Sequence, residues 1–510
     1  MWLTGSDQKR LMRAERLPFH PPIPLQMISN GEYMPLRQTR EQREVARRLR
    51  ANAQRHAARL GMDASPYLHT KFGMAAAFMA MNEVHGGYFA TDPEEASDPE
   101  AVSKRTDRYA PQFVFDAQTH HVRPSYRWEP LLNLRRWTSG KNPWKSVWNP
   151  AVVELPEDLE QFKLEAYVRN MFFESDTTLA ILTGFTSETK ELEPLNSDEI
   201  VRSRDLVNRL AGSRRLYAQG LFWPGFPGNL DEMDRIATEL RIDSWKGYAV
   251  GDLLADSMYP WRMDDEKVTY PAYEKARRHG IRNVSVHKGL LPAVDYKAFR
   301  AWRYAMVDDV GRAAQDWPDL NFIIYHAAFR PLLDASSAVA EFRETGRIPW
   351  VTDLAEIPEK YGVSNVYAEL GTTFATVCVT FPELAAAIVA QCVRGMGADH
   401  VIWGTDSIWW GSPQWQIEAL RRLEVPEAMR KAHDLPALGP GDGQIKNQIL
   451  GLNLARLFGI DAKLRPGSIP PDYVDRLSAL KAEYEKNDPL PSQVRYGWVS
   501  KPKGAPLLVE

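Results

Sequence analysis

Cysteine is scarce in this 510-residue chain, which contains only Cys378 and Cys392. Both lie in apolar stretches, and two cysteines can build neither a disulfide framework nor a cysteine-based zinc site. A reducing compartment suits such a chain, so we expect a cytoplasmic protein. Any metal ion that the chain binds has to be held by histidine, carboxylate and amide groups.

Long apolar runs and an excess of one charge are missing as well. The longest apolar candidate, Phe72–Met81, has ten residues, whereas a membrane span needs roughly 18. We therefore predict a buried helix there and no membrane partner. Lys plus Arg number 63 against 66 Asp plus Glu, which leaves a formal net charge of −3. This balance argues against a nucleic-acid partner, because proteins that bind phosphates carry a basic excess.

Both ends of the chain are predicted to lie outside the main fold. Five prolines in residues 1–35 indicate an extended arm, and residues 36–60 predict an arginine-rich helix with a solvated or subunit-docking face. The acidic stretch Asp92–Asp107 is predicted to be a linker. Residues 1–110 thus form an N-terminal extension, and the Pro-rich residues 462–510, with one helix over Pro471–Lys486, form a C-terminal arm. We expect these arms to mediate homo- or hetero-oligomeric assembly.

Between these ends, short β-branched or aromatic runs alternate with helical patterns at a steady spacing. Eight runs are predicted as strands: Phe113–Ala117, Thr178–Thr183, Arg215–Phe222, Gly247–Val250, Asn283–His287, Asn321–His326, Asn365–Leu370 and Val401–Thr405. Well-marked helices are predicted over Tyr270–Gly280, Pro382–Met396, Trp415–Leu423 and Ile445–Phe458. Eight strand–helix repeats predict a closed parallel (β/α)8 TIM barrel over residues 111–461. An open doubly wound sheet is the alternative, but no Gly-x-Gly-x-x-Gly turn follows the first strand.

The positions of the histidines are the informative feature for function. His120, His121, His287 and His326 lie at or just beyond the carboxyl ends of the first, fifth and sixth predicted strands, and Asp406 follows the eighth. In a (β/α)8 barrel, active sites are built at this rim. Imidazole nitrogens and a carboxylate suit a divalent transition ion such as Zn²⁺, Mn²⁺ or Fe²⁺. We therefore predict a metal centre of one or two ions.

The ordered set of motifs resembles the amidohydrolase superfamily, and within it the amidohydrolase-related branch that includes aminocarboxymuconate-semialdehyde decarboxylase and dihydroxybenzoate decarboxylases. The resemblance rests on Phe115-Asp-Ala-Gln-Thr-His-His121, Val286-His-Lys-Gly289, Tyr325-His-Ala-Ala328, Gly404-Thr-Asp406 and Ile449–Gly459. It implies that His120, His287 and Asp406 bind metal. His326 would contact substrate as an acid or base, or bind a second ion.

The first strand departs from the family pattern. Gln118 stands where the family has the first histidine of a His-x-His pair, and a neutral amide is a weaker ligand than imidazole. His121 is either a structural imidazole or a replacement ligand, so Gln118 and His121 both stay in the candidate set. Glu369, at the end of the seventh strand, is the best extra carboxylate for a second ion, with a salt bridge as its alternative role.

These observations predict a metal-dependent hydrolase or non-oxidative decarboxylase that acts on a small carboxylated substrate. His326 and Asp406 are its candidate catalytic residues, because a free imidazole can protonate a leaving group and a carboxylate can accept the proton of a metal-bound water. An oxygenase that uses iron or manganese in the same barrel is one alternative. A non-catalytic partner subunit of a hetero-oligomeric complex is the other.

Overall fold

The computed structural model describes residues 20–26, 32–33, 35–126, 136, 139–143, 145, 147, 160–254, 257–291, 295–331, 335–409, 411–460 and 476–487. The predicted helix over Pro471–Lys486 is present as α21 (Arg476–Asn487), and its first five predicted residues lie outside the described residues. In the described part of the chain, no helix combines the length and apolar character that a membrane crossing requires.

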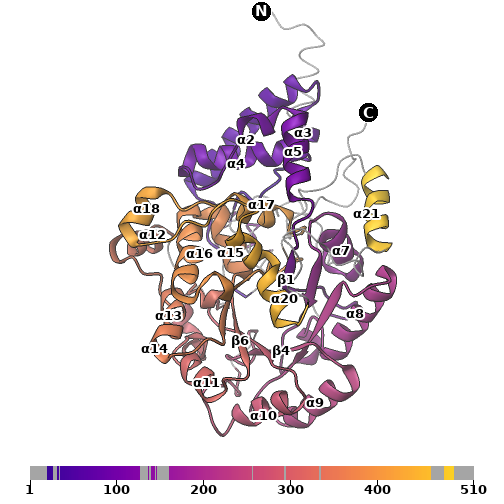
Figure 1. Ribbon diagram of the computed structural model, residues 1–510, viewed down its shortest axis with the longest axis vertical. Helices are drawn as coiled ribbons and strands as arrows, with labels where there is room; N and C mark the ends of the chain where they lie inside the picture. The colour runs from indigo at the N-terminus through magenta and orange to yellow at the C-terminus, as the bar shows by residue number, and fades with distance from the viewer. Residues whose placement is uncertain are drawn as a thin grey trace, which may run out of the picture.

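Eight parallel strands form one sheet in the order β1 to β8, as the sequence predicted. Figure 1 labels β1, β4 and β6 among them. They are β1 (Phe115–Thr119), β2 (Leu179–Leu182), β3 (Leu216–Leu221), β4 (Ser244–Tyr248), β5 (Asn283–His287), β6 (Asn321–Tyr325), β7 (Val366–Glu369) and β8 (Val401–Ile402). The chain after β8 closes the sheet onto β1: the amide of Ala117 donates to the carbonyl of Trp403 (2.9 Å), and Thr119 pairs with Ser407 in parallel. The protein is therefore a (β/α)8 barrel.

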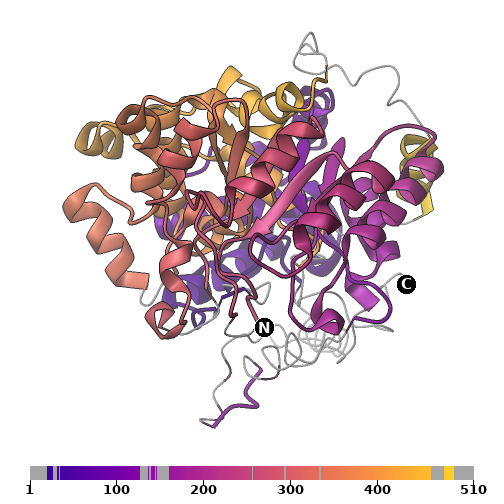
Figure 2. The same ribbon diagram turned by 90° about the horizontal axis from the view of Figure 1, so that it is seen from below.

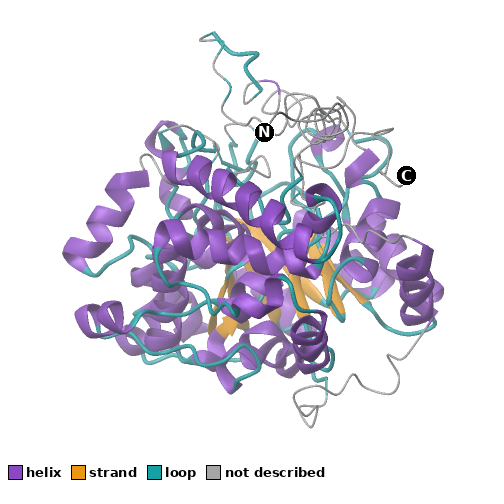
Figure 3. Cartoon of the chain, turned by 90° about the horizontal axis from the view of Figure 1, so that it is seen from above, coloured by secondary structure: helices purple, strands orange, loops and turns teal. Residues whose placement is uncertain are grey.

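Alternation along the strands separates two hydrophobic layers. One cluster lines the barrel interior and includes Phe115, Ile181, Ile323 and Tyr325, and helix α20 (Asn453–Leu457) contributes Leu454 and Ala455 to it. The opposite side chains, such as Val284, Val286 and Ile324, pack against the surrounding helices. Because neighbouring side chains on a strand point to opposite faces, both sides of the strands are buried, and helices enclose them in Figure 2 and Figure 3.

The helices between the strands follow the predicted pattern closely. Helix α16 (Pro382–Met396) has the predicted bounds, and α10 (Tyr270–Arg278) and α17 (Gln414–Arg422) differ from theirs by one or two residues. The predicted helix over Ile445–Phe458 is α19 (Gln444–Asn447), a π-helical turn and α20. The other helices of the barrel region are α7 (Leu164–Val168), α8 (Ser197–Ala211), α9 (Asn229–Arg235), α11 (Val310–Asp316), α12 (Ala335–Thr345), α13 (Val351–Ala355), α14 (Ile357–Tyr361), α15 (Gly371–Thr380) and α18 (Glu427–His433).

The N-terminal extension contains more helix than the sequence indicated. Helices α2 (Arg40–Arg59), α3 (Ala64–Leu68) and α4 (Lys71–His85) gather at one end of the molecule in Figure 1. The stretch predicted as a linker instead forms a short 3-10 helix and then α5 (Pro99–Tyr109). The reason is local: the Asp98 side chain accepts a hydrogen bond from the Glu100 amide, and Pro99 occupies the first helical position, where proline is favourable.

Candidate metal centre

His287 and His326 meet at the mouth of the barrel for different local reasons. On β5, Val284 and Val286 face outward, so alternation directs His287 inward. On β6 the inward residue is Tyr325, and regular alternation would turn His326 away. A positive φ of 63° at His326 redirects the chain there, and its ring lies 4.7 Å from that of His287 in an edge-on arrangement. Two strand ends thus place two imidazoles in contact.

Glu32 reaches the same point from the N-terminal extension. Its Oε1 lies 3.7 Å from Nδ1 of His287, and its Oε2 lies 3.5 Å from Nε2 of His326. The hydroxyl of Tyr248 donates a hydrogen bond of 3.1 Å to Oε1 of Glu32. One ligand atom from each of Glu32, His287 and His326 lies within 4.8 Å of the others, which is the spacing of a potential metal site. Sequence reasoning missed Glu32, because no pattern in the arm relates it to a strand end.

Gln118, His120 and Asp406 form a second group beside the first. Nε2 of His120 lies 3.0 Å from Oδ1 of Asp406 and 3.5 Å from Nε2 of Gln118. The pairing of β1 with β2 is irregular between Asp116 and Thr119, and such irregularities re-aim side chains. Asp116 accepts hydrogen bonds from the Gln118 amide and the Thr405 amide, both 3.1 Å, and so ties the two strand ends together.

His121 lies outside this group. Its Nε2 is 2.9 Å from the hydroxyl of Ser203 and its Nδ1 is 3.2 Å from the carbonyl of Val122. Burial lowers the pKa of His121 to about 4, so the imidazole is neutral at pH 7. With both nitrogens engaged by other groups, the structure favours the structural role for His121 over that of a replacement ligand.

Two buried ionisable groups, Glu369 and Lys246, lie near these side chains, and the sequence indicated only the first of them. Glu369 was considered as an extra carboxylate; its Oε2 accepts the amide of His326 (3.0 Å), and burial raises its pKa well above the usual range. Lys246 was missed, because the fourth strand was predicted to begin at Gly247. The strand begins at Ser244, and Nζ of Lys246 lies 3.5 Å from the ring centre of Tyr325. The alternation of Ser244, Lys246 and Tyr248 was the available signal in the sequence.

The electrostatics of the two central imidazoles suit metal binding. Burial, with a contribution from the Lys246 ammonium, lowers the pKa of His287 and of His326 well below the usual range, so both rings are neutral and can offer a lone pair. Among the described residues, Nδ1 of His287 and both ring nitrogens of His326 have no hydrogen-bond partner. Buried polar atoms nearly always have a partner, and the mixture of imidazole and carboxylate donors fits a divalent transition ion.

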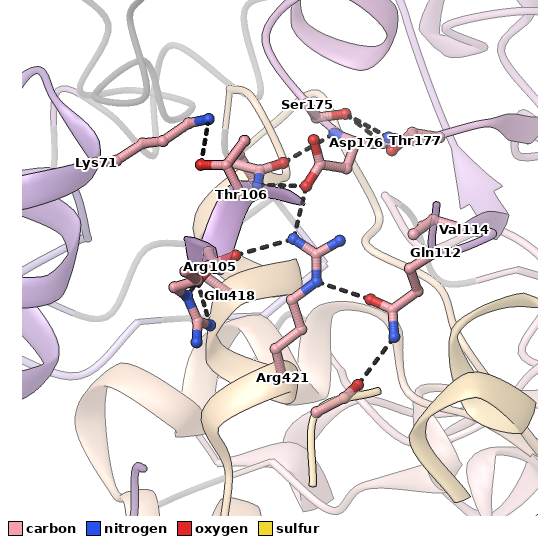
Figure 4. Close-up of polar contacts among 12 residues, drawn as sticks. Lys71, Arg105, Thr106, Gln112, Val114, Ser175, Asp176, Thr177, Glu418 and Arg421 are labelled. Carbon is pink, nitrogen blue, oxygen red and sulfur yellow. Dashed lines mark hydrogen bonds and ion pairs between the residues drawn. The ribbon is translucent and has the colours of Figure 1, made fainter. Parts of the chain in front are cut away.

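A separate cavity of about 520 Å³ lies between the N-terminal extension, α17 and α21. Its charged side chains are largely paired with one another (Figure 4): the guanidinium of Arg421 contacts Asp176 at 2.6 Å and Glu418 at 2.9 Å, and its Nε donates to Gln112 at 2.8 Å. None of the predicted site residues lines this cavity. Its ion pairs connect the extension to the barrel, since Glu418 also binds Arg105 of α5 at 2.8 Å.

A parallel barrel whose rim gathers imidazoles and carboxylates is an arrangement that metal-dependent barrel enzymes use. Residues 215–460, just under half of the chain, match the family model described as Amidohydrolase. This match agrees with the predicted resemblance to amidohydrolases. The matched residues include His287, His326 and Asp406 but not Gln118 or His120, so the first strand, where the motif departs, lies outside the match.

Several solved structures also resemble this chain. An uncharacterised TIM-barrel protein from Bordetella bronchiseptica is 15% identical, with a TM-score of 0.43 over 69% of this chain and 99% of that chain. The 5-carboxyvanillate decarboxylase from Sphingomonas paucimobilis is 14% identical, with a TM-score of 0.37 over 69% and 100%. The manganese-containing 5-carboxyvanillate decarboxylase from Novosphingobium aromaticivorans is 14% identical, with a TM-score of 0.38 over 69% and 97%. No curated protein sequence matches the chain.

Proposed function

We propose that this protein is a hydrolase or non-oxidative decarboxylase of a small carboxylated organic substrate and that it uses Zn²⁺, Mn²⁺ or Fe²⁺. The observation that carries the proposal is the meeting of His287 and His326 at the barrel mouth. Both are fully buried, and they have ring nitrogens with no hydrogen-bond partner among the described residues. Maintaining such an arrangement costs free energy unless a ligand satisfies these nitrogens.

The residues at the rim divide into holding and proton-moving groups. His287 and His326 would hold the ion, with His120 and Asp406 next to them, and Gln118 would contribute its amide oxygen. A bound ion of this kind lowers the pKa of a water ligand toward about 7. Asp406 is the candidate proton acceptor: the hydroxyl of Thr372 donates a hydrogen bond to its Oδ2, which leaves the orientation of the carboxylate defined.

Two features of the site favour a substrate with a carboxylate and an apolar body. The Lys246 ammonium is buried, its Nζ has no hydrogen-bond partner within the described part of the chain, and burial lowers its pKa to about 7. The charges of Glu32, Glu369 and Asp406 act on this ammonium, and an anionic substrate group would add a hydrogen-bond acceptor to them. The ring of Trp409 lies 5.8 Å from that of His120 and 5.3 Å from that of Phe162, which places aromatic surface beside the metal ligands.

The first experiment measures metal content and turnover in the same samples. The purified chain is loaded with Mn²⁺, Zn²⁺ or Fe²⁺, freed of excess metal, and supplied with a panel of aromatic and aliphatic carboxylic acids, esters and amides. We expect stoichiometric metal, and the loss of both metal and turnover in His287→Ala. The control is His279→Gln, because His279 follows the outer helix α10 and pairs with Asp234 of α9.

The products separate the proposal from its rivals. Release of CO2 from a carboxylic acid without oxygen uptake identifies a decarboxylase, and release of an acid with an alcohol or amine identifies a hydrolase. Oxygen consumption that requires iron or manganese would instead establish the oxygenase. A chain that binds no metal, turns over no substrate and co-purifies with a second barrel would establish the partner subunit. A His287→Ala variant that keeps full activity and its full metal content would contradict the assignment of His287 to the metal site.

A further inference from the structure

Glu32 belongs to no strand end and to no motif of the barrel. We propose that the N-terminal extension completes the metal centre, with Glu32 as a carboxylate ligand beside His287 and His326. The inference rests on the proposed metal dependence and adds to it a ligand from outside the barrel. It also gives the extension a chemical role, because the barrel alone would then hold an incomplete site.

The distances between the donor atoms are those expected around one ion. Two ligand atoms that each lie 2.0–2.2 Å from a tetrahedral ion are about 3.4 Å apart. The Glu32 carboxylate lies 3.5 Å from Nε2 of His326 and 3.7 Å from Nδ1 of His287. One ligand atom from each of the three residues lies within 4.8 Å of the others, so joint coordination requires the donors to move closer together.

Neighbouring groups orient the same three donors. Nε2 of His287 lies 3.2 Å from the carbonyl of Leu290, and donation to that oxygen leaves the lone pair on Nδ1, the atom that faces Glu32. The hydroxyl of Tyr248 binds Oε1 of Glu32, and its ring stacks on His287 with 4.7 Å between ring centres. Hydrogen bonds of this kind, which fix the tautomer of a histidine and the orientation of a carboxylate, are the usual support of metal ligands.

Glu32 faces ring nitrogens that the barrel leaves without a hydrogen-bond partner. Among the described residues, Nδ1 of His287 and both ring nitrogens of His326 lack such a partner, and a cation placed between these rings and the carboxylate would engage all three side chains. The first strand supplies Gln118 in place of an imidazole ligand, so a carboxylate from elsewhere would replace the missing donor and add a negative charge.

The N-terminal extension is hydrogen-bonded to helix α15, whose first residue lies next to the imidazole of His326. The hydroxyl of Tyr33, next to Glu32, lies 2.9 Å from that of Thr376, and Nε2 of Gln42 donates to Thr380 at 3.2 Å. Both threonines belong to α15, whose first residue is Gly371. A Cβ atom on Gly371 would lie 2.7 Å from Nδ1 of His326, so one rigid helix positions the arm relative to the imidazole.

The test replaces Glu32 in the full-length chain and measures metal binding directly. Wild type, Glu32→Gln, Glu32→Asp and the control Glu41→Gln are stripped of metal and titrated with Mn²⁺ by calorimetry and with Co²⁺ by visible absorption. Glu41 is an exposed carboxylate of the same extension, at the start of α2. Thermal unfolding of each metal-free variant shows whether the fold is retained.

We expect Glu32→Gln to weaken Mn²⁺ binding by more than about 100-fold, since changes to groups that only support a ligand already cost 10–100-fold. Glu32→Asp should recover part of the loss, and Glu41→Gln should bind like wild type. Tyr248→Phe, which removes only the hydrogen bond to Glu32, should weaken binding by roughly 10-fold and serves if Glu32→Gln fails to fold. Wild-type affinity and an unchanged Co²⁺ spectrum in Glu32→Gln would overturn the inference while leaving metal dependence intact. A wild-type chain that takes up no metal would overturn both.

Discussion

The carboxylate of Glu369 occupies the space that a side chain at Gly404 would need. A Cβ atom on Gly404 would lie 1.6 Å from Oε1 of Glu369, and Gly404 precedes Asp406 by two residues. The Glu369 carboxylate can therefore occupy this position only because residue 404 is a glycine. This explains in physical terms why glycine precedes Thr405 and Asp406 in the motif after β8.

We expect Gly404→Ala to destabilise the fold by about 1–3 kcal/mol, the usual cost of overpacking a buried site. The measurement is the free energy of unfolding in denaturant. Gly87→Ala is the control, because nothing lies within 4 Å of its Cβ position. The double variant Gly404→Ala with Glu369→Ala should be more stable than the sum of the single effects predicts, since the two groups compete for one space. Strict additivity would contradict the steric explanation.

The two adjacent histidines after β1 should behave differently toward metal. His120→Gln is expected to lower metal affinity, because its Nε2 faces Asp406. His121→Gln should retain wild-type metal content and lose only about 1–2 kcal/mol of stability, since its nitrogens contact Ser203 and Val122. Metal analysis of both purified variants makes the comparison. Loss of metal in His121→Gln with retained folding would restore it as a ligand.

Glu418 forms ion pairs with three guanidinium groups, one from the extension and two from α17. Its carboxylate lies 2.8 Å from Arg105, 2.9 Å from Arg421 and 3.3 Å from Arg422. Glu418→Gln should cost about 3–5 kcal/mol, because it leaves three buried guanidinium groups with only two carboxylates, Asp176 and Glu95. Glu427→Gln, which removes only an exposed pair with Lys431, should change stability by less than about 0.5 kcal/mol. Equal stabilities of the two variants in chemical denaturation would refute the role of the network.

Lys446 should make stability depend on pH in the alkaline range. Burial lowers the pKa of Lys446 to about 8, although its Nζ donates to the carbonyls of Arg421 and Leu423. Between pH 8 and about 10.4, the ordinary lysine value, the unfolded chain binds more protons than the native one. The Lys446 contribution to the free energy of unfolding therefore rises across that window and is flat below it.

The measurement for Lys446 is a difference between two proteins. Lys446→Met lacks the titrating group, so its stability should fall progressively further behind wild type as pH increases from 8 to 10. Groups that titrate in both proteins cancel in this difference. A constant gap across the window would show that the ammonium has the same pKa in the folded and unfolded chains.

Local patterns predicted most of the barrel correctly. The fifth strand, Asn283–His287, and helix α16 have the predicted bounds, because β-branched residues and a capped apolar stripe report directly on strands and helices. The fourth strand was predicted too far toward the carboxyl end, because a lysine in the sequence usually indicates an exposed position. The strand begins at Ser244 and includes Lys246. In the barrel, the interior face of β4 lies next to carboxylates and aromatic rings, which accommodate Lys246.

Strand ends were sufficient to nominate His287, His326 and Asp406, because the carboxyl ends of parallel strands converge on one rim. The amino-acid sequence by itself thus determined the barrel, the rim at which its strands end, and the types of side chain available to a metal ion. Three-dimensional packing decided the rest: the backbone turn at His326, the engagement of His121 with Ser203, and the docking of Glu32 from the extension. These depend on contacts between segments remote in sequence, and periodicity within a segment carries no information about such contacts.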